Sequence, residues 1–248
     1  MNLNSYKKLP KSLKFSDLII HEDEDFVVIN KPPFVSSLDE RTADNTASIL
    51  QMAREYTQDP QLCHRLDKET SGALIIAKNP EAYRHVAMQF ENREIIKAYH
   101  AVVNGVHEFD NVSVYLPIAP LKNGTEVRID RVKGKIAETI FHTLKVYQKH
   151  TLVQCLPISG RMHQIRVHLQ CLKAPIVCDP TYGGDYIYLS ELKRKFHLKK
   201  GTTELPLIKR VALHAHGIKF KLLSNEEIKI VAPYAKDFEV LIKQLDKV

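Results

Sequence analysis

A polar turn that leads directly into an apolar strand constrains this chain more than any other feature. The turn spans residues 64–72 and reads HRLDKETSG, and the five residues after it, ALIIA, predict a buried strand. One carboxylate, Asp67, therefore lies at the entry to the core, close to Arg65 and just before a Thr-Ser-Gly turn. A carboxylate held in this way suits a nucleophile or a general base fixed in a cleft.

The composition is that of a folded protein. Of its 248 residues, 44% are hydrophobic and 26% are charged, which is ordinary for a globular chain. No apolar run approaches the roughly 20 residues of a membrane-spanning helix, and residues 1–8 lack the apolar segment of a signal peptide. We therefore expect a cytoplasmic protein without a membrane partner.

The cysteine pattern fits the same compartment. The four cysteines form no CxxC pair, and we expect them to be reduced and mostly buried as small apolar residues; they are Cys63, Cys155, Cys171 and Cys178.

The net charge of +7 indicates a polyanionic partner, of which nucleic acid is the commonest. The basic residues are densest in the run 193–200, which reads KRKFHLKK. This run is either a solvated face or a patch that follows RNA phosphates.

The chain reads as a basic N-terminal arm over residues 1–16 followed by a single domain over residues 17–248. Strands and helices are mixed without regular alternation, which predicts an α+β fold whose central sheet is mixed, mostly antiparallel and flanked by helices and loops. Strands are expected at Ile19–Ile20, Phe26–Ile29, Ile95–Val103, Val112–Ile118, Glu126–Val132, Ala137–Tyr147, Thr151–Leu156, Ile218–Leu222 and Ile228–Val231. Helices are expected at Thr46–Tyr56, from the cap Asn79 to Glu91, at Arg161–Leu172 and at the C-terminus.

Residues 64–72 resemble the signature of the RluA-type RNA pseudouridine synthases, and five further blocks fit that family in the same order. These blocks are the opening strand and NKP turn over 25–33, KAYHAVVNG over 97–105, SGRMHQIRVHL over 159–169, and the PI…D…YG and LHA blocks over 175–183 and 213–215. Met162 stands where threonine is usual and Cys178 where glycine is usual. We expect no S4-type RNA-binding module before residue 17.

The resemblance implies the pseudouridine synthase catalytic fold with a central RNA-binding cleft. It also implies an isomerase that detaches a uracil base from C1′ and rejoins it through C5, with neither cofactor nor metal. Asp67 would be the catalytic carboxylate, Arg166 its ion-pair partner, and Tyr99 the residue stacked on the base. Leu213 would form an apolar wall, and Arg65 would fill the space left by a flipped-out uridine.

Three weaker assignments complete the expected site. His64, Arg161 and His163 are expected to bind substrate, although a bracing role for Arg161 or His163 stays open. A structural zinc is disfavoured, because His163 and His168 are five residues apart rather than the four that place a helical pair on one face.

Two other functions compete with isomerisation. A non-catalytic RNA-binding or RNA-folding chaperone on the same scaffold would be expected to lose Asp67 or Arg166, and both are present. A glycosidase-like hydrolase usually needs a second carboxylate, which these blocks do not supply. The RNA target is expected to be a tRNA or large-subunit rRNA, with a monomeric protein and no obligate protein partner.

Overall fold

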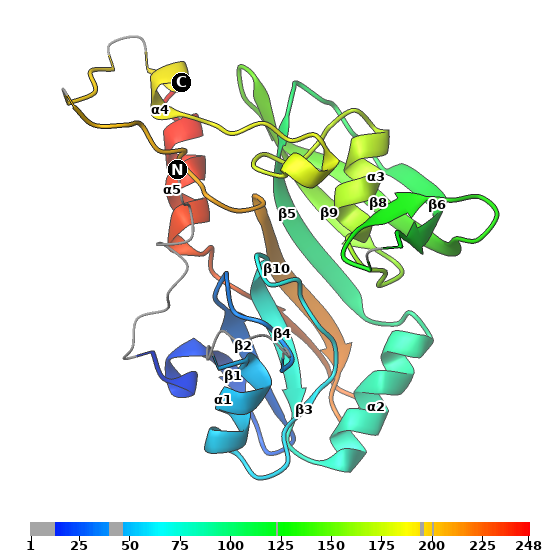
Figure 1. The fold of residues 1–248 in the computed structure, drawn as a ribbon. Coiled ribbons are helices and arrows are strands. Elements are labelled where there is room, and N and C mark those ends of the chain that lie inside the picture. The colour runs from blue at the N-terminus through cyan, green and yellow to red at the C-terminus, as the bar shows by residue number, and fades with distance from the viewer. Residues whose placement is uncertain (1–12, 40–46, 123, 194–195, 200) are drawn as a thin grey trace. The chain divides into compact units, whose positions relative to one another are not determined.

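The structure is a computed structural model that describes residues 13–39, 47–122, 124–193, 196–199 and 201–248. It divides into two compact units. The first combines Met1–Ala98 with His214–Ala235, and the second combines Tyr99–Leu213 with Lys236–Val248. Each unit is described by itself below (Figure 1).

Unit 1 is built on a twisted sheet in which β4 is central. The order is β1-β2-β4-β10, with β3 paired to β4 and β11 to β10. The pairing of β4 with β10 is parallel, whereas β1–β2, β2–β4, β3–β4 and β10–β11 are antiparallel. The strands are β1 (Ile19–Glu22), β2 (Phe26–Lys31), β3 (Gln61–Leu62), β4 (Ser71–Ala77), β10 (Leu213–Lys221) and β11 (Glu227–Val231).

Each of the α-helices α1 and α2 of unit 1 begins at a side-chain cap. Ser48 accepts a hydrogen bond from the Gln51 N–H at the start of α1 (Ile49–Tyr56), and Asn79 accepts one from the Ala82 N–H at the start of α2 (Pro80–Glu91). A short 3₁₀ helix, η2 (Phe15–Leu18), precedes β1. All seven residues of β4 are buried, which fits the apolar run over residues 73–77.

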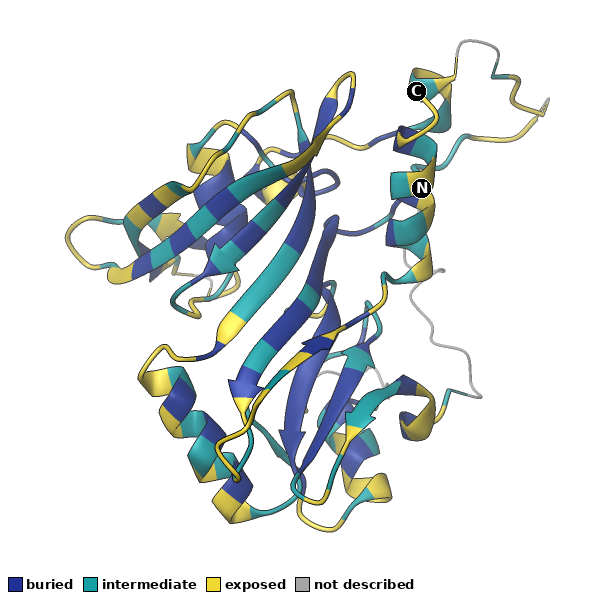
Figure 2. Ribbon diagram, turned by 180° about the vertical axis from the view of Figure 1, so that it is seen from behind, coloured by how far each residue is buried: buried dark blue, intermediate teal, exposed yellow. Residues whose placement is uncertain are grey.

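Unit 2 is an antiparallel sheet in the order β5-β9-β8-β6-β7, and its helices follow β9 in the chain. Its buried residues gather on the strands and on α3, while the exposed residues mark the hairpin ends (Figure 2). The strands are β5 (Ile96–Asn104), β6 (Val112–Pro120), β7 (Val127–Ile129), β8 (Lys135–Val146) and β9 (His150–Pro157). The helices are α3 (Gln164–Cys171), η3 (Pro180–Tyr182), α4 (Leu189–Leu192) and α5 (Lys236–Leu245).

The predicted fold class is confirmed: the chain is α+β with a mixed, mostly antiparallel sheet. Several element boundaries differ from the predictions. The largest difference is at the strand predicted over Ile218–Leu222, which begins at Leu213. The helix predicted from Arg161 begins only at Gln164, because His163 has a left-handed backbone with φ 51°. The strand predicted to Val132 ends at Ile129, because the Asp130 carboxylate accepts hydrogen bonds from two following N–H groups and turns the chain.

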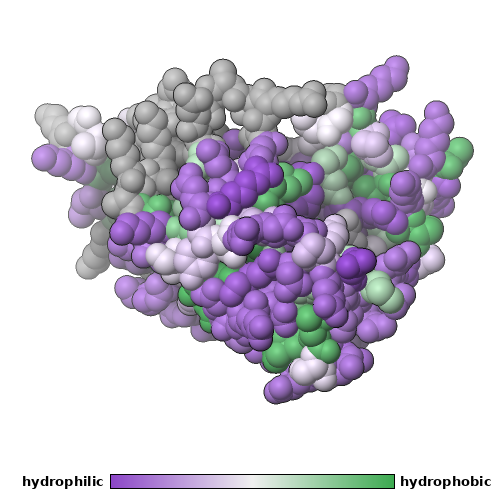
Figure 3. Space-filling view, turned by 90° about the horizontal axis from the view of Figure 1, so that it is seen from below, coloured by the Kyte–Doolittle hydropathy of each residue, from purple (hydrophilic) through white to green (hydrophobic). Residues whose placement is uncertain are grey.

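The expected burial of the cysteines is only partly correct. Cys155 and Cys178 are buried and Cys63 is half-buried, but Cys171 is exposed at the end of α3. The surface turned to the viewer in Figure 3 is mostly hydrophilic and is broken only by small hydrophobic patches.

Several predictions lie partly outside the described residues. They concern most of the N-terminal arm and the first residue of the helix predicted from Thr46. They also concern three residues of the basic run, Arg194, Lys195 and Lys200. The single domain over 17–248 stays a prediction.

Candidate active site

The Asp67 turn is fixed by main-chain hydrogen bonds on both sides of the carboxylate. Asp67 is half-buried, and its carbonyl accepts a hydrogen bond of 3.0 Å from the Thr70 N–H, which closes the turn. On the preceding residue, Leu66, the Ser37 hydroxyl donates to the carbonyl over 2.9 Å and accepts from the N–H over 3.1 Å. Ser37 and Leu66 are both buried, so water does not compete for these bonds.

The residue after Asp67, Lys68, is also fixed by hydrogen bonds to its main chain. The Lys68 carbonyl accepts one hydrogen bond from the Phe34 N–H over 2.8 Å and another from the Lys31 ammonium over 3.2 Å. Lys31 is fully buried, and its ammonium also donates to the carbonyls of Pro32 and Val35. The lysine of the NKP block therefore ties its own turn to the turn that carries Asp67.

His64 supports the same segment from the strand side. Its Nε2 accepts a hydrogen bond of 3.1 Å from the Ile75 N–H, so the ring is neutral with its proton on Nδ1. Burial, with a smaller contribution from the positive charge of Lys97, lowers the pKa of His64 to about 3. The side chain thus braces β4, while contact with RNA stays a prediction. The neighbouring Arg65 is exposed.

At the start of β4, directly after the turn, the backbone approaches β10 closely. Gly72 has φ 116°, and a Cβ built on it would lie 2.2 Å from the Ala215 carbonyl oxygen on β10. Beside it, the Ser71 hydroxyl and His214 Nδ1 are 2.9 Å apart in a fully buried pair. The Ser-Gly of the signature is therefore required by packing against the LHA block.

In unit 2, Arg166 is held by an ion pair that the sequence did not reveal. Its Nε and Nη2 each donate over 2.7 Å to one carboxylate oxygen of Asp179, and both side chains are buried. The Tyr182 ring lies under the guanidinium with its centroid 4.9 Å from Cζ. The ion pair of Arg166 with Asp67 joins residues of different units and stays a prediction.

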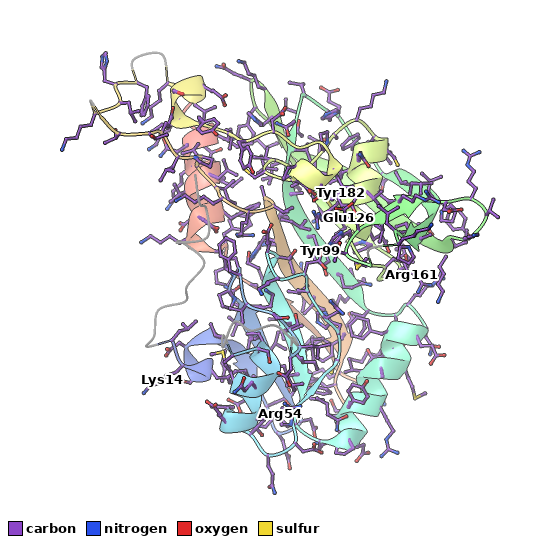
Figure 4. The ribbon with its side chains drawn as sticks, in the orientation of Figure 1. Lys14, Arg54, Tyr99, Glu126, Arg161 and Tyr182 are labelled. Atoms are coloured by element: carbon purple, nitrogen blue, oxygen red, sulfur yellow. The ribbon has the colours of Figure 1, made fainter. Side chains whose placement is uncertain are left out.

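The turn before α3 is organised by a single amide. Gln164 Oε1 accepts from the Ser159 hydroxyl and the Arg161 N–H, and its Nε2 donates to the Glu138 carbonyl and the Thr139 hydroxyl. Arg161 itself is exposed on this turn (Figure 4). The glutamine gives the block a structural reason for its Ser159 and Gln164, since one side chain connects the turn to β8.

His163 is partly a bracing residue. Its Nδ1 lies 3.0 Å from the Tyr182 hydroxyl, which also accepts from the Val127 N–H and donates to the Val127 carbonyl. Burial is the main cause that raises the pKa of Tyr182 above its ordinary value. The tyrosine links α3, η3 and β7, and this connection, like Asp179, has its only sequence signal in the PI…D…YG block.

The remaining expected residues are also on defined elements of unit 2. Tyr99 is half-buried on β5, opposite Cys155 of β9 (Figure 4). Leu213 is buried at the start of β10. Among the described residues, no cluster of three or more His, Cys, Asp or Glu side chains could hold a metal ion.

A family model described as RNA pseudouridylate synthase matches residues 25–171, which include the Asp67 turn and Arg166. The chain belongs to the RNA pseudouridylate synthase family. It is accordingly an RNA pseudouridine synthase, an isomerase, and the expected RluA-type relationship is confirmed.

Similar proteins match this chain over nearly its whole length. A ribosomal large subunit pseudouridine synthase C of Buchnera aphidicola is 37% identical over 94% of this chain and 72% of its own length. The synthase C of Vibrio parahaemolyticus is 34% identical over 97% of this chain and 73% of its own length. Human RNA pseudouridylate synthase domain containing 4 has a similar structure, with a TM-score of 0.68, 25% identity and 94% coverage of each chain.

A membrane-crossing helix, which must be long and continuously apolar, is not found in the part of the chain that the structure describes.

Proposed function

We propose that this synthase converts uridine to pseudouridine in large-subunit ribosomal RNA, with Asp67 as the catalytic carboxylate. The similar synthases of Buchnera and Vibrio are named for the large ribosomal subunit, which supports ribosomal RNA over tRNA as the substrate. The observation that carries the assignment of Asp67 is the rigidity of its turn, in which the main chain is fixed at Leu66, at Asp67 itself and at Lys68.

The reaction requires such a fixed carboxylate. The C1′–N1 bond of the uridine breaks, the uracil turns, and a C1′–C5 bond forms while C5 gives up a proton and N1 takes one up, so no atoms are gained and no electrons are exchanged. Asp67 either forms a covalent adduct or assists formation of a glycal, and both routes need an ionised carboxylate held at the reacting atoms.

The other residues complete the proposed site. Arg166 keeps Asp67 ionised, since a nearby guanidinium favours the charged form of a carboxylate. Tyr99 stacks on the base and takes part in removal of the C5 proton, and Leu213 forms the apolar wall. Arg65, which is exposed in the protein, fills the space that the flipped uridine leaves.

The deciding experiment is nucleotide-resolution pseudouridine mapping of total RNA from a strain that lacks this gene. The strain is complemented with wild type, with Asp67→Asn, or with Glu69→Gln as a control that changes another acid of the same turn. We expect one or more large-subunit sites to vanish in the deletion strain and to return with wild type and Glu69→Gln but not with Asp67→Asn.

Each other result overturns a named part of the proposal. A lost site in tRNA would change the substrate, and a site restored by Asp67→Asn would remove Asp67 from catalysis. No lost site would favour an RNA-binding protein without this activity. Release of uracil from RNA by the purified protein would indicate a hydrolase instead.

A further inference from the structure

Arg210, three residues before Leu213, is almost completely buried, with 1% of its surface exposed. It lies outside the residues that the family resemblance singled out, and the proposed reaction does not use it. A buried guanidinium is costly unless its N–H groups are paired, so the location of its hydrogen bonds indicates what it does.

The guanidinium faces a carboxylate on one side. Its Nε and Nη2 donate over 2.7 and 2.9 Å to the two carboxylate oxygens of Asp237, in the first turn of α5. Burial raises the pKa of Asp237, but the hydrogen bonds and charge of Arg210, with help from the Phe238 N–H, outweigh this and leave the pKa below its ordinary value. The pair is therefore a stable charged anchor on α5.

On its other side the guanidinium binds the main chain that ends in Leu213. Nη1 donates to the Leu213 carbonyl over 3.0 Å and to the Val211 carbonyl over 3.3 Å. The Leu213 N–H also donates to the Val211 carbonyl over 2.7 Å, so residues 211–213 form a three-residue turn. Arg210 thus binds both ends of this turn.

The middle of the same turn is held by the sheet of unit 2. The Ala212 N–H donates to the Val177 carbonyl, and the Ala212 carbonyl accepts from the Val102 N–H of β5. With Ala212 fixed at these two points, the remaining freedom of the turn is rotation of its two ends. The carbonyl contacts of Arg210 restrict that rotation and hence the direction of the Leu213 side chain.

We infer that Arg210, anchored by Asp237 of α5, is a positioning residue that sets the orientation of Leu213 toward the uracil ring. This inference rests on the proposed function, in which Leu213 is the apolar wall of the base site. It assigns to the C-terminal helix a part in the reaction, although no residue of α5 belongs to the proposed base site.

The test is a double-mutant cycle on the rate of pseudouridine formation under single-turnover conditions with saturating enzyme. The substrate is large-subunit ribosomal RNA from the deletion strain, and the variants are Arg210→Met, Leu213→Ala and the double variant. We expect each single variant to slow the reaction by about 10–100-fold, as misplacement by about 1 Å does. The double variant should be no slower than the worse single variant, because both remove the same contact.

A matched control separates positioning from general stability. Asp246 follows the other end of α5 and pairs with Lys145 over 2.6 Å, so Asp246→Asn also removes an ion pair of this helix without touching the 211–213 turn. We expect Asp246→Asn to retain the wild-type rate within about twofold, because exposed pairs contribute little, and its effect to multiply with that of Leu213→Ala.

Asp237→Asn keeps the measurement informative if Arg210→Met does not fold. It leaves the guanidinium in place and weakens only its anchor, so we expect a smaller slowing that is again not multiplicative with Leu213→Ala. Arg210→Lys should not restore the rate, because a single ammonium cannot bind Asp237 and the two carbonyls in a planar fork.

Failure of this inference differs from failure of the proposed function. Multiplicative effects of Arg210→Met, or of Asp237→Asn in its place, and Leu213→Ala would overturn the inference alone, with wild-type activity intact. A wild-type rate for Leu213→Ala would overturn both the apolar wall and the inference. Absence of product from the wild-type enzyme would overturn the proposed function.

Discussion

The turn around Asp67 and the segment around Arg166 are both fixed, but by different means. In unit 1 the atoms that are held are main-chain groups, and the Ser37 hydroxyl and the Lys31 ammonium hold them. In unit 2 the held group is the charged side chain itself, which Asp179 pairs and Tyr182 covers. The first arrangement fixes the main chain on either side of Asp67, and the second gives a guanidinium one direction.

The largest effect that we expect concerns Gly72, where β4 meets β10. Gly72→Ala should destabilise the protein by about 5 kcal/mol, at the upper end of single substitutions, because the added Cβ would overlap the Ala215 carbonyl oxygen. Gly183→Ala is the control, since Gly183 also has a positive φ, 87°, but no atom within 4 Å of the added Cβ. Urea unfolding followed by circular dichroism compares them, and equal losses would show that backbone conformation alone matters.

The second largest effect concerns the ion pair of Arg166 with Asp179, which Asp179→Asn breaks. Removing one member of a buried ion pair leaves the other charge uncompensated, so we expect a loss of about 3–5 kcal/mol. Asp246→Asn, which breaks an exposed pair, should cost at most about 1 kcal/mol. If the two variants unfold at the same urea concentration, Asp179 is not the main support of Arg166.

The main-chain contacts of the Asp67 turn are weakened by Ser37→Ala. It removes both hydrogen bonds to Leu66 and leaves a buried N–H without its hydroxyl acceptor, which should cost about 1–3 kcal/mol. The rate of pseudouridine formation should fall at least about tenfold, because Asp67 directly follows Leu66 and would lose its fixed position. Ser113→Ala, at an exposed serine bonded to Glu138, should leave the rate and the stability unchanged. Wild-type kinetics in Ser37→Ala would show that the turn keeps its shape without this contact.

The smallest effect is a pH dependence that arises from His64. Its folded-state pKa of about 3 lies below the ordinary 6.5, so the unfolded chain binds the proton more readily. The stability contributed by neutral His64 is therefore complete above about pH 6.5 and is lost progressively as the pH falls toward about 3, with a loss of about 1 kcal/mol near pH 6. His64→Gln should flatten this part of the curve of unfolding free energy against pH.

Other histidines do not confuse this comparison. Burial also lowers the pKa of His168, to about 4, and it is present in both proteins. The difference between the wild-type and His64→Gln curves therefore isolates His64, and parallel curves would contradict the neutral bracing role.

The sequence by itself determined the fold class and the segments that carry the candidate site residues. The apolar run of β4, the cap at Asn79 and the polar turn before β4 are local signals, because a strand or helix is read from the spacing of neighbouring residues. The family resemblance then assigned Asp67, Tyr99 and Arg166 to one reaction, and membership of the family is confirmed.

Only the tertiary structure decided which groups hold these residues. Asp179 reaches Arg166 from 13 residues away, Ser37 reaches Leu66 from 29, and Asp237 reaches Arg210 from 27. Such partners leave no periodic pattern, since their pairing depends on how the chain returns to a buried polar group that must be satisfied. The left-handed His163, which shortened the predicted α3, follows the same rule: its backbone is set by the contacts around the turn rather than by the apolar spacing of the helix.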